Sequence, residues 1–186
     1  MKLLLALCFT LVMPTQLVAG NRWQESVHKS VAKVTVYSPE NKPLYSGSVF
    51  AISPRQLVTA NHVCAGVKPG GTIGIRESNR VIGFKIKKIN RGADLCLLEG
   101  PHKLKPLKLA NRQPKIGEKA SVFGYPLGVG AFLTEGSYGY EAEIYGDLRQ
   151  FLSIQSCGGN SGSPVLNKYG RVTGVLIEGI SSPFNP

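Results

Sequence analysis

Residues 158–165 have the sequence Gly-Gly-Asn-Ser-Gly-Ser-Pro-Val, and this stretch is the strongest indication of the fold in the chain. The glycines around Ser161 permit backbone dihedral angles that other residues avoid. In such a loop the N–H groups of Gly159 and Ser161 can converge on one point, where two donors stabilise the oxyanion of a tetrahedral intermediate. One such donor typically lowers a barrier by ~2.7–4 kcal/mol. Ser161 is therefore a candidate nucleophile, with the amides of Gly159 and Ser161 as the candidate oxyanion hole.

A serine nucleophile needs a base that takes its proton and a carboxylate that orients this base. His62 follows the run 57–61, Leu-Val-Thr-Ala-Asn, where a strand is expected to turn out of the core. Asp94 precedes the apolar run 95–98, Leu-Cys-Leu-Leu, and lies at the edge of a buried region. A carboxylate in that position requires a partner, because an unpaired buried charge is costly. An imidazole donor supplies one, so His62 and Asp94 are the candidate partners of Ser161.

The remainder of the chain has the pattern of an all-β protein. Runs rich in β-branched and apolar residues alternate with turns rich in Gly, Pro and Asn, and long helical periodicity is absent. A short helical turn is expected within 24–31, and strands at this spacing favour a sandwich or a barrel. Strands are predicted at 31–37, 44–52, 56–59, 72–76, 81–89, 95–98, 120–124, 133–144, 150–155, 163–166 and 172–177.

Three segments together resemble the signatures of trypsin-like serine peptidases. The order His, Asp, Ser is the order of that clan and differs from the order in subtilisin-like enzymes and α/β-hydrolases. The third segment resembles bacterial glutamyl endopeptidases most closely, and the first two also resemble HtrA-like proteases. The segments are Ala60-Asn61-His62-Val63, Asp94-Leu95-Cys96-Leu97-Leu98 and Gly159-Asn160-Ser161-Gly162-Ser163-Pro164-Val165.

The resemblance implies a chymotrypsin-like fold, in which two packed antiparallel β-barrels, six-stranded in family members, hold the active site in the cleft between them. It implies an N-terminal barrel over 21–100, an interbarrel linker over 101–114 and a C-terminal barrel over 115–186. Because the chain ends soon after Gly179, the second barrel is expected to be minimal, or completed by the N-terminal segment.

The implied activity is serine endopeptidase hydrolysis of peptide bonds through an acyl-enzyme intermediate. His62 would be the general base and later the general acid, Asp94 would orient it, and Ser161 would attack. The substrates would be peptides or proteins. Two alternatives stay open: a catalytically dead relative that serves as a binding module, and a protease dedicated to its own processing or to one partner. The presence of all three triad residues argues against the first.

The substrate pocket departs from the best-known members of the family. By their position relative to family members, Gln155, Ser156, Leu176 and Glu178 are expected to line the primary pocket or its rim. Leu176 stands where glutamyl endopeptidases carry His, and Gln155 stands where trypsin-like members carry Asp. An apolar or small residue is therefore expected before the scissile bond. Asn160 replaces the Asp that pairs with a freed N-terminus in digestive proteases, so a trypsin-like zymogen switch is not expected.

Three cysteines follow the N-terminal segment: Cys64, Cys96 and Cys157. Cys64 and Cys96 each lie two residues after a member of the candidate triad, so a bridge between them is one hypothesis and buried free thiols are the alternative. The cysteines show no short ligand spacing such as Cys-x-x-Cys, so neither a metal site nor a cofactor is expected.

The other histidines and the second aspartate are not expected to be catalytic. The residues around His28 and His102 do not resemble a catalytic motif, so both are expected at the surface. Asp147 is expected in a turn.

Residues 1–20 are predicted to be a signal peptide, with Lys2 before the apolar run 3–13 and small residues at 18–20. The run is shorter than the ~20 apolar residues of a membrane span. The mature chain is therefore expected to be secreted or periplasmic, without a transmembrane segment. The formal net charge is +11, but no aromatic residues interleave with the basic patches. No specific nucleic acid is expected as a partner, whereas an anionic surface stays open.

Overall fold

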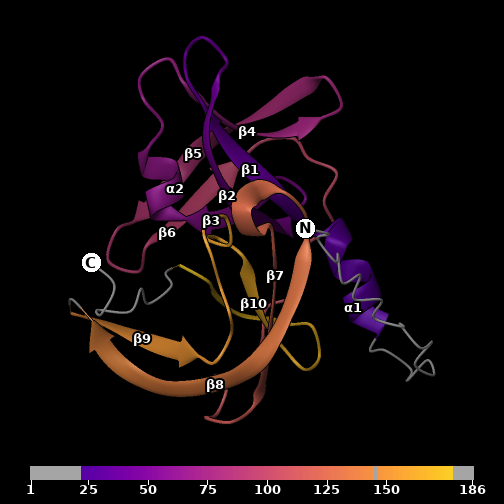
Figure 1. Cartoon of the computed structure of the whole chain (residues 1–186), viewed down its shortest axis with the longest axis vertical. Coiled ribbons are helices and arrows are strands. Elements are labelled where there is room, and N and C mark those ends of the chain that lie inside the picture. Colours follow the sequence, from indigo (N-terminus) through magenta and orange to yellow (C-terminus); the bar gives the residue numbers. More distant parts are fainter. Residues whose placement is uncertain (1–21, 145, 178–186) are drawn as a thin grey trace, which may run out of the picture.

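Six strands from the first part of the chain close into an antiparallel barrel in this computed structural model, which describes residues 22–144 and 146–177 (Figure 1). The order around the barrel is β1-β2-β3-β6-β5-β4, and β1 closes it by pairing with both β2 and β4. The strands are β1 (Val31–Tyr37), β2 (Pro43–Ser53), β3 (Gln56–Ala60), β4 (Thr72–Glu77), β5 (Arg80–Asn90) and β6 (Leu95–Glu99).

Strand β1 shows why the β-branched runs form this barrel. Ala32, Val34 and Val36 alternate along the strand and enter the barrel core, as the two-residue period of a strand requires. Val31 points the other way, into a second cluster that also contains Phe50. The strand is almost entirely buried because both of its faces are covered.

The second unit is an antiparallel sheet of five strands in the order β11-β10-β7-β8-β9. Its strands are β7 (Lys119–Gly124), β8 (Phe132–Ile144), β9 (Asp147–Leu152), β10 (Pro164–Asn167) and β11 (Val172–Val175). Over the described residues this sheet is a half-barrel, whereas the family pattern implies six strands. The expected all-β, chymotrypsin-like two-barrel fold is confirmed.

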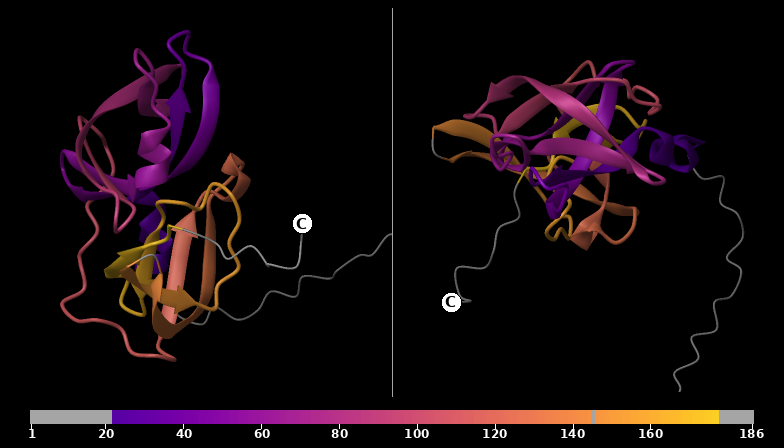
Figure 2. Two further views of the ribbon diagram at one scale, coloured as in Figure 1. Left: turned by 90° about the vertical axis from the view of Figure 1, so that its left-hand side faces the viewer. Right: turned by 90° about the horizontal axis from the view of Figure 1, so that it is seen from above.

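A shared core fixes the two units against each other. Phe50 from β2 is 1% exposed and packs in one cluster with Phe123 from β7 and Leu166 from β10. Burying side chains of this size contributes roughly 1.5–3 kcal/mol each. Figure 2 shows the two units one above the other, joined by an extended connection that contains no named strand between Glu99 and Lys119. The loops where the two units meet are therefore supported by a packed core that both units share.

Several local expectations need correction. His62 follows the end of strand β3, as expected, but it lies in a short helix, α2 (Asn61–Ala65), that was not predicted. Five residues are too few for helical periodicity to be visible in the sequence. Strand β9 begins at Asp147, which was expected in a turn, and ends before the predicted stretch does. His28 is exposed as expected, but both ring nitrogens of His102 are buried, so the prediction of a surface residue was wrong there.

The N-terminal part of the described chain forms α1 (Arg22–Ser26) and the 3-10 turn η1 (Val27–Lys29), near the predicted helical turn. A second 3-10 turn, η2 (Pro126–Gly128), follows β7. The predicted signal peptide and Glu178 lie outside the described residues. None of the described helices has the length and apolar character that crossing a membrane requires.

Candidate active site

Helix α2 begins where β3 ends, and Asp94 satisfies its first two N–H groups. Ala60 precedes the helix with extended dihedral angles and offers no side-chain cap. The Asn61 N–H donates to the Asp94 carbonyl oxygen at 2.9 Å, and the His62 N–H donates to Asp94 Oδ1 at 2.9 Å. The opening N–H groups of a helix have no partner within the helix. Asp94 therefore does for α2 what a capping residue does, although it is distant in sequence.

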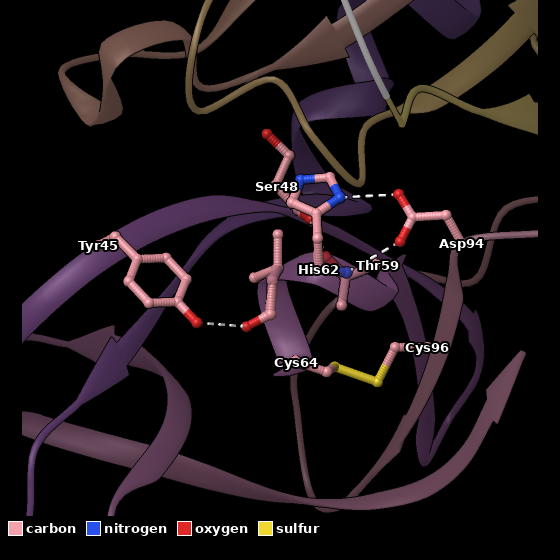
Figure 3. The surroundings of a disulfide bond; sticks show 8 residues. Tyr45, Ser48, Thr59, His62, Cys64, Asp94 and Cys96 are labelled. Atoms are coloured by element: carbon pink, nitrogen blue, oxygen red, sulfur yellow. Dashed lines mark hydrogen bonds and ion pairs between the residues drawn. A yellow bond between two sulfur atoms is a disulfide. The ribbon is translucent and has the colours of Figure 1, made fainter. Parts of the chain in front are cut away.

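The second carboxylate oxygen of Asp94 contacts the imidazole. His62 Nδ1 lies 2.7 Å from Asp94 Oδ2, as Figure 3 shows. Nδ1 is the donor in this contact, which leaves Nε2 free to accept a proton. The His62 side chain is 48% exposed and the Asp94 side chain is 20% exposed, so the ring faces solvent while the carboxylate is held behind it. This is the contact that the sequence predicted between the two residues.

The loop that carries Ser161 requires glycine at two positions. Gly159 and Gly162 have φ angles of +95° and +89°, which side chains disfavour. A Cβ added to Gly162 would lie 2.1 Å from the Ser48 carbonyl oxygen, and one added to Gly159 would lie 2.4 Å from the Tyr125 carbonyl oxygen. The loop is thus packed directly against backbone from both units.

Backbone pairing in this loop leaves several amides without a protein acceptor, and the two proposed for the oxyanion hole are among them. The N–H groups of Asn160, Gly162 and Ser163 donate to the carbonyl oxygens of Cys157, Leu176 and Asn160, at 3.2, 2.7 and 2.9 Å. The N–H groups of Gly159 and Ser161 have no acceptor within residues 22–144 and 146–177. Buried backbone donors in folded chains are nearly always paired, whereas donors that reach the surface can bond to water or a ligand, and Gly159 and Ser161 are only partly buried. Two unpaired donors on either side of Asn160 are therefore available for an oxygen that is not part of the protein.

Contacts with Gly47 and Ser48 bring the Ser161 loop to the segment that carries His62. The Ser48 N–H donates to the Ser161 carbonyl oxygen at 2.8 Å. A Cβ added to Gly47 would lie 2.9 Å from that same oxygen and 2.9 Å from a methyl carbon of Val63, the residue after His62. The Ser161 hydroxyl has no hydrogen-bond partner among the described residues, His62 included. Catalytic hydrogen bonds are often long without substrate.

A disulfide joins Cys64 in α2 to Cys96 in β6 (Figure 3). The structure therefore has the bridge that the sequence left as one of two hypotheses. Cys157 is a free and exposed thiol. No set of three or more His, Cys, Asp or Glu side chains within the described ranges is placed to hold a metal ion.

Of the residues predicted to line the substrate pocket, three are described. Leu176 pairs through its backbone with Gly162 and Ser163, and its side chain packs against the buried cluster of Ala120, Val122, Tyr138 and Val165. Ser156 is exposed and accepts a long hydrogen bond from Asn160 Nδ2, at 3.4 Å. Leu176 and Ser156 thus adjoin the Ser161 loop. Gln155 is exposed next to Ser156, and Glu178 is outside the described residues.

The sequence model of the trypsin-like peptidase domain matches residues 46–175, which include His62, Asp94 and Ser161. Among curated proteins, the serine protease Rv3671c of Mycobacterium tuberculosis is 27% identical over 177 residues. That match covers 88% of this chain and 44% of the relative. The glutamyl endopeptidase of Staphylococcus epidermidis is 26% identical over 170 residues, covering 81% of this chain and 60% of the relative.

Solved structures give the same picture of the fold. The active form of the M. tuberculosis Rv3671c protease superimposes with a TM-score of 0.69 at 25% identity, covering 95% of this chain and 83% of that one. Deg5 superimposes with a TM-score of 0.70 at 21% identity, covering 84% of this chain and 83% of that one. The chain spans less than half the length of the M. tuberculosis relative found by sequence.

Proposed function

Because the chain belongs to the trypsin-like peptidase family, we propose that it is a serine endopeptidase that hydrolyses peptide bonds through an acyl-enzyme intermediate. The observation that carries this proposal is the 2.7 Å contact between His62 Nδ1 and Asp94 Oδ2. It orients an imidazole whose second nitrogen is free, next to a loop that holds a serine and two unpaired N–H groups. These are the parts that acyl transfer to a serine requires.

In the proposed reaction, Ser161 Oγ attacks the carbonyl carbon of the scissile peptide bond while His62 Nε2 takes the hydroxyl proton. The Asp94 carboxylate stabilises the imidazolium that forms. Negative charge develops on the former carbonyl oxygen, where the N–H groups of Gly159 and Ser161 donate to it. When the tetrahedral intermediate collapses, the C–N bond breaks and the leaving amine takes the proton from His62. The acyl group remains on Ser161.

Deacylation repeats these steps with water. His62 Nε2 takes a proton from the water as its oxygen attacks the ester carbon, and the same two N–H groups stabilise the second oxyanion. The ester bond then breaks, Ser161 Oγ recovers its proton from His62, and the acid product leaves. Apart from the substrate and this water, both halves of the proposed reaction use only groups of the chain.

A fluorophosphonate probe tests the activity directly, because it labels a serine only when its neighbours activate it. We expect the wild-type protein to be labelled and Ser161→Ala to remain unlabelled. Ser163→Ala is the matched control, since Ser163 lies two residues away and is fully buried. Absence of labelling in folded wild-type protein would support the alternative of a catalytically dead binding module.

The alternative of a dedicated protease needs a separate comparison. Digestion of casein measures general endopeptidase activity, whereas mass spectrometry of the purified chain, with Ser161→Ala as reference, detects self-processing. We propose general endopeptidase activity and expect casein to be degraded. Cleavage confined to the chain itself, or to one co-purified partner, would support the dedicated role instead.

We propose an apolar or small residue before the scissile bond. Support comes from the uncharged side chains of Gln155, Ser156 and Leu176 and from the packing of Leu176 against an apolar cluster. A peptide library read by mass spectrometry tests this specificity. A cleavage profile dominated by Glu, Asp, Lys or Arg before the cut would overturn it.

We also propose that residues 1–20 are a signal peptide and that the mature protein is secreted or periplasmic. Expression of the full chain, followed by N-terminal sequencing of exported protein, should give Asn21 as the first residue.

We propose barrels over 21–100 and 115–186 joined by a linker over 101–114. The gap in named strands between β6 and β7 supports that division.

A basic groove supports the proposal of an anionic surface as a partner. The groove has a volume of about 690 Å³, and Lys105, Lys108 and Arg171 line it without an acidic partner among the described residues. Arg112, also in the groove, pairs with Glu118. Retention on heparin should fall when the three unpaired cations are replaced by Ala. Equal retention of this variant and the wild type would place any anion binding elsewhere.

A further inference from the structure

Each half of the candidate site is held by a residue from the opposite unit. Ser48 on β2, in the first barrel, bonds to the loop of Ser161 in the second unit. Arg149 on β9, in the second unit, bonds to the loop before Asp94 in the first barrel. We propose that Ser48 and Arg149 are reciprocal positioning residues of the active site. This inference rests on the proposed peptidase function.

Ser48 is fully buried, with an exposed fraction of 0%, and all of its polar groups are used. Its N–H donates to the Ser161 carbonyl oxygen at 2.8 Å, and its Oγ donates to the Gly159 carbonyl oxygen at 2.9 Å. The same Oγ accepts the Tyr125 N–H at 3.0 Å, and the Ser48 carbonyl oxygen accepts the Thr59 hydroxyl at 2.7 Å. One residue thus joins β3, the Ser161 loop and the turn that follows β7.

The hydroxyl of Ser48 acts on the direction of the oxyanion-hole amides. In a trans peptide group the N–H points opposite to the preceding C=O. The Gly158 carbonyl oxygen accepts the Leu127 N–H at 2.6 Å, which directs the Gly159 N–H away from the η2 turn. Ser48 Oγ holds both Tyr125, which precedes that turn, and Gly159 itself. Loss of the hydroxyl therefore frees the Gly159 carbonyl and the residue before the η2 turn, so that the Gly158–Gly159 peptide group keeps only its contact with Leu127.

Arg149 supports the other half of the site. Its Nη2 donates to the Gly92 carbonyl oxygen at 2.6 Å, and its Nη1 makes a longer hydrogen bond of 3.4 Å to the Ala93 carbonyl oxygen. These two carbonyls immediately precede Asp94, whose φ of +51° is unusual for a residue other than glycine. The planar guanidinium can serve both carbonyls from one position, which an ammonium cannot. Arg149 thus holds the backbone from which the Asp94 carboxylate reaches His62.

The Ser48 role is tested by separating kcat from KM on a peptide substrate. Interactions made only in the transition state affect kcat. Removing one oxyanion-hole donor outright lowers kcat by roughly 10²–10³-fold, so misdirecting it in Ser48→Ala should lower kcat by about 10- to 100-fold with little change in KM. The affinity for a peptide aldehyde, which forms a tetrahedral adduct with Ser161, should fall in parallel.

Ser121→Ala is the matched control, because Ser121 is equally buried on β7 and makes no contact with the Ser161 loop. It should leave kcat and aldehyde affinity unchanged. Unchanged kcat in Ser48→Ala, or a higher KM with unchanged kcat, would overturn the role of Ser48. Equal losses in both serine variants would show a general effect of lost buried hydroxyls and would overturn it as well.

The Arg149 role has a spectroscopic readout in the proton that His62 Nδ1 donates to Asp94. We expect Arg149→Gln to broaden or shift the far-downfield NMR resonance of this proton and to lower kcat. Arg149→Lys should retain intermediate activity because one carbonyl can still be held. Arg76→Gln, which removes an exposed arginine that lies over the Tyr37 ring, is the control and should change neither readout. An unchanged resonance and kcat in Arg149→Gln would overturn the role.

Amide hydrogen exchange tests the same inference without any substrate. In Ser48→Ala, exchange should accelerate within residues 157–162, and in Arg149→Gln within residues 91–94. If the wild-type protein fails to label with fluorophosphonate, the proposed function fails, while faster exchange would still support the structural contacts. Unchanged exchange in both variants would overturn the positioning inference even in an active enzyme.

Discussion

Cys64 and Cys96 are bonded to each other, and each lies two residues after one member of the His62–Asp94 pair. The bridge ties helix α2, which carries His62, to strand β6, which begins directly after Asp94. Both residues of the contact therefore have a covalent anchor within two positions. The proposed catalytic contact and the only disulfide of the described chain form one local unit.

The double variant Cys64→Ala/Cys96→Ala should lose stability and activity together. A disulfide that closes a loop of 32 residues typically contributes about 2–4 kcal/mol to the free energy of unfolding. Urea unfolding measures the first effect and peptide hydrolysis the second. Cys157→Ala, at the free and exposed thiol, should change stability little. If reduction of the bridge, verified by thiol titration, leaves both quantities unchanged, the bridge has no anchoring role.

Asp94→Asn and Asp94→Ala should separate the two contacts of this carboxylate. Asn keeps an oxygen that can accept the His62 N–H but cannot stabilise an imidazolium, so kcat should fall by roughly 10⁴-fold with stability largely retained. Ala removes the capping oxygen too, which should cost about a further 1 kcal/mol of stability. Activity assays measure the fall in kcat of the two variants, and denaturant unfolding measures their stability. Equal stability of the two variants would contradict the capping function.

Gly162→Ala should destabilise the chain strongly. The φ of +89° disfavours any side chain, and the new Cβ would lie 2.1 Å from the Ser48 carbonyl oxygen. Strained backbone alone costs on the order of 1–3 kcal/mol, and the clash adds to it. Gly158→Ala is the control in the same loop, because a Cβ there would meet no atom within 4 Å. Equal melting temperatures for the two variants would contradict this packing.

His102 should make stability depend on pH. Burial lowers the pKa of this imidazole below its ordinary value of 6.5 and outweighs the opposite effect of the nearby backbone of Ser53 and Leu104. As pH falls below 6.5, the unfolded chain binds a proton that the folded chain resists, so stability declines until the lowered pKa is passed. His102→Leu should flatten this slope in unfolding experiments between neutral and mildly acidic pH.

The exposed His28 supplies the control for that experiment. A loss of slope in His28→Leu as large as that in His102→Leu would show that the effect does not come from burial of His102. If the slope of His102→Leu matches that of the wild-type protein, other groups account for the pH dependence.

The strands and the candidate triad could be predicted from the sequence because they depend on local patterns. Val31–Tyr37 is correct to the residue, since alternating β-branched side chains define a strand without reference to its neighbours. The sequence indicated Ser161 because glycines flank it. It indicated His62 and Asp94 because each adjoins an apolar strand. The contact between His62 and Asp94 followed from the cost of an unpaired carboxylate at a buried edge.

The tertiary structure alone decided the rest. Helix α2 has five residues and is capped by Asp94 from a loop distant in sequence, so no local sequence pattern predicts it. Ser48 and Arg149 look ordinary in sequence and become positioning candidates only because the two units pack against each other. The pairing of Cys64 with Cys96 likewise depends on which segments become neighbours. Local sequence patterns reflect which side chains of a segment become buried. Contacts between the two units depend instead on how all segments pack together, because the free energy of the whole core determines which of them become neighbours.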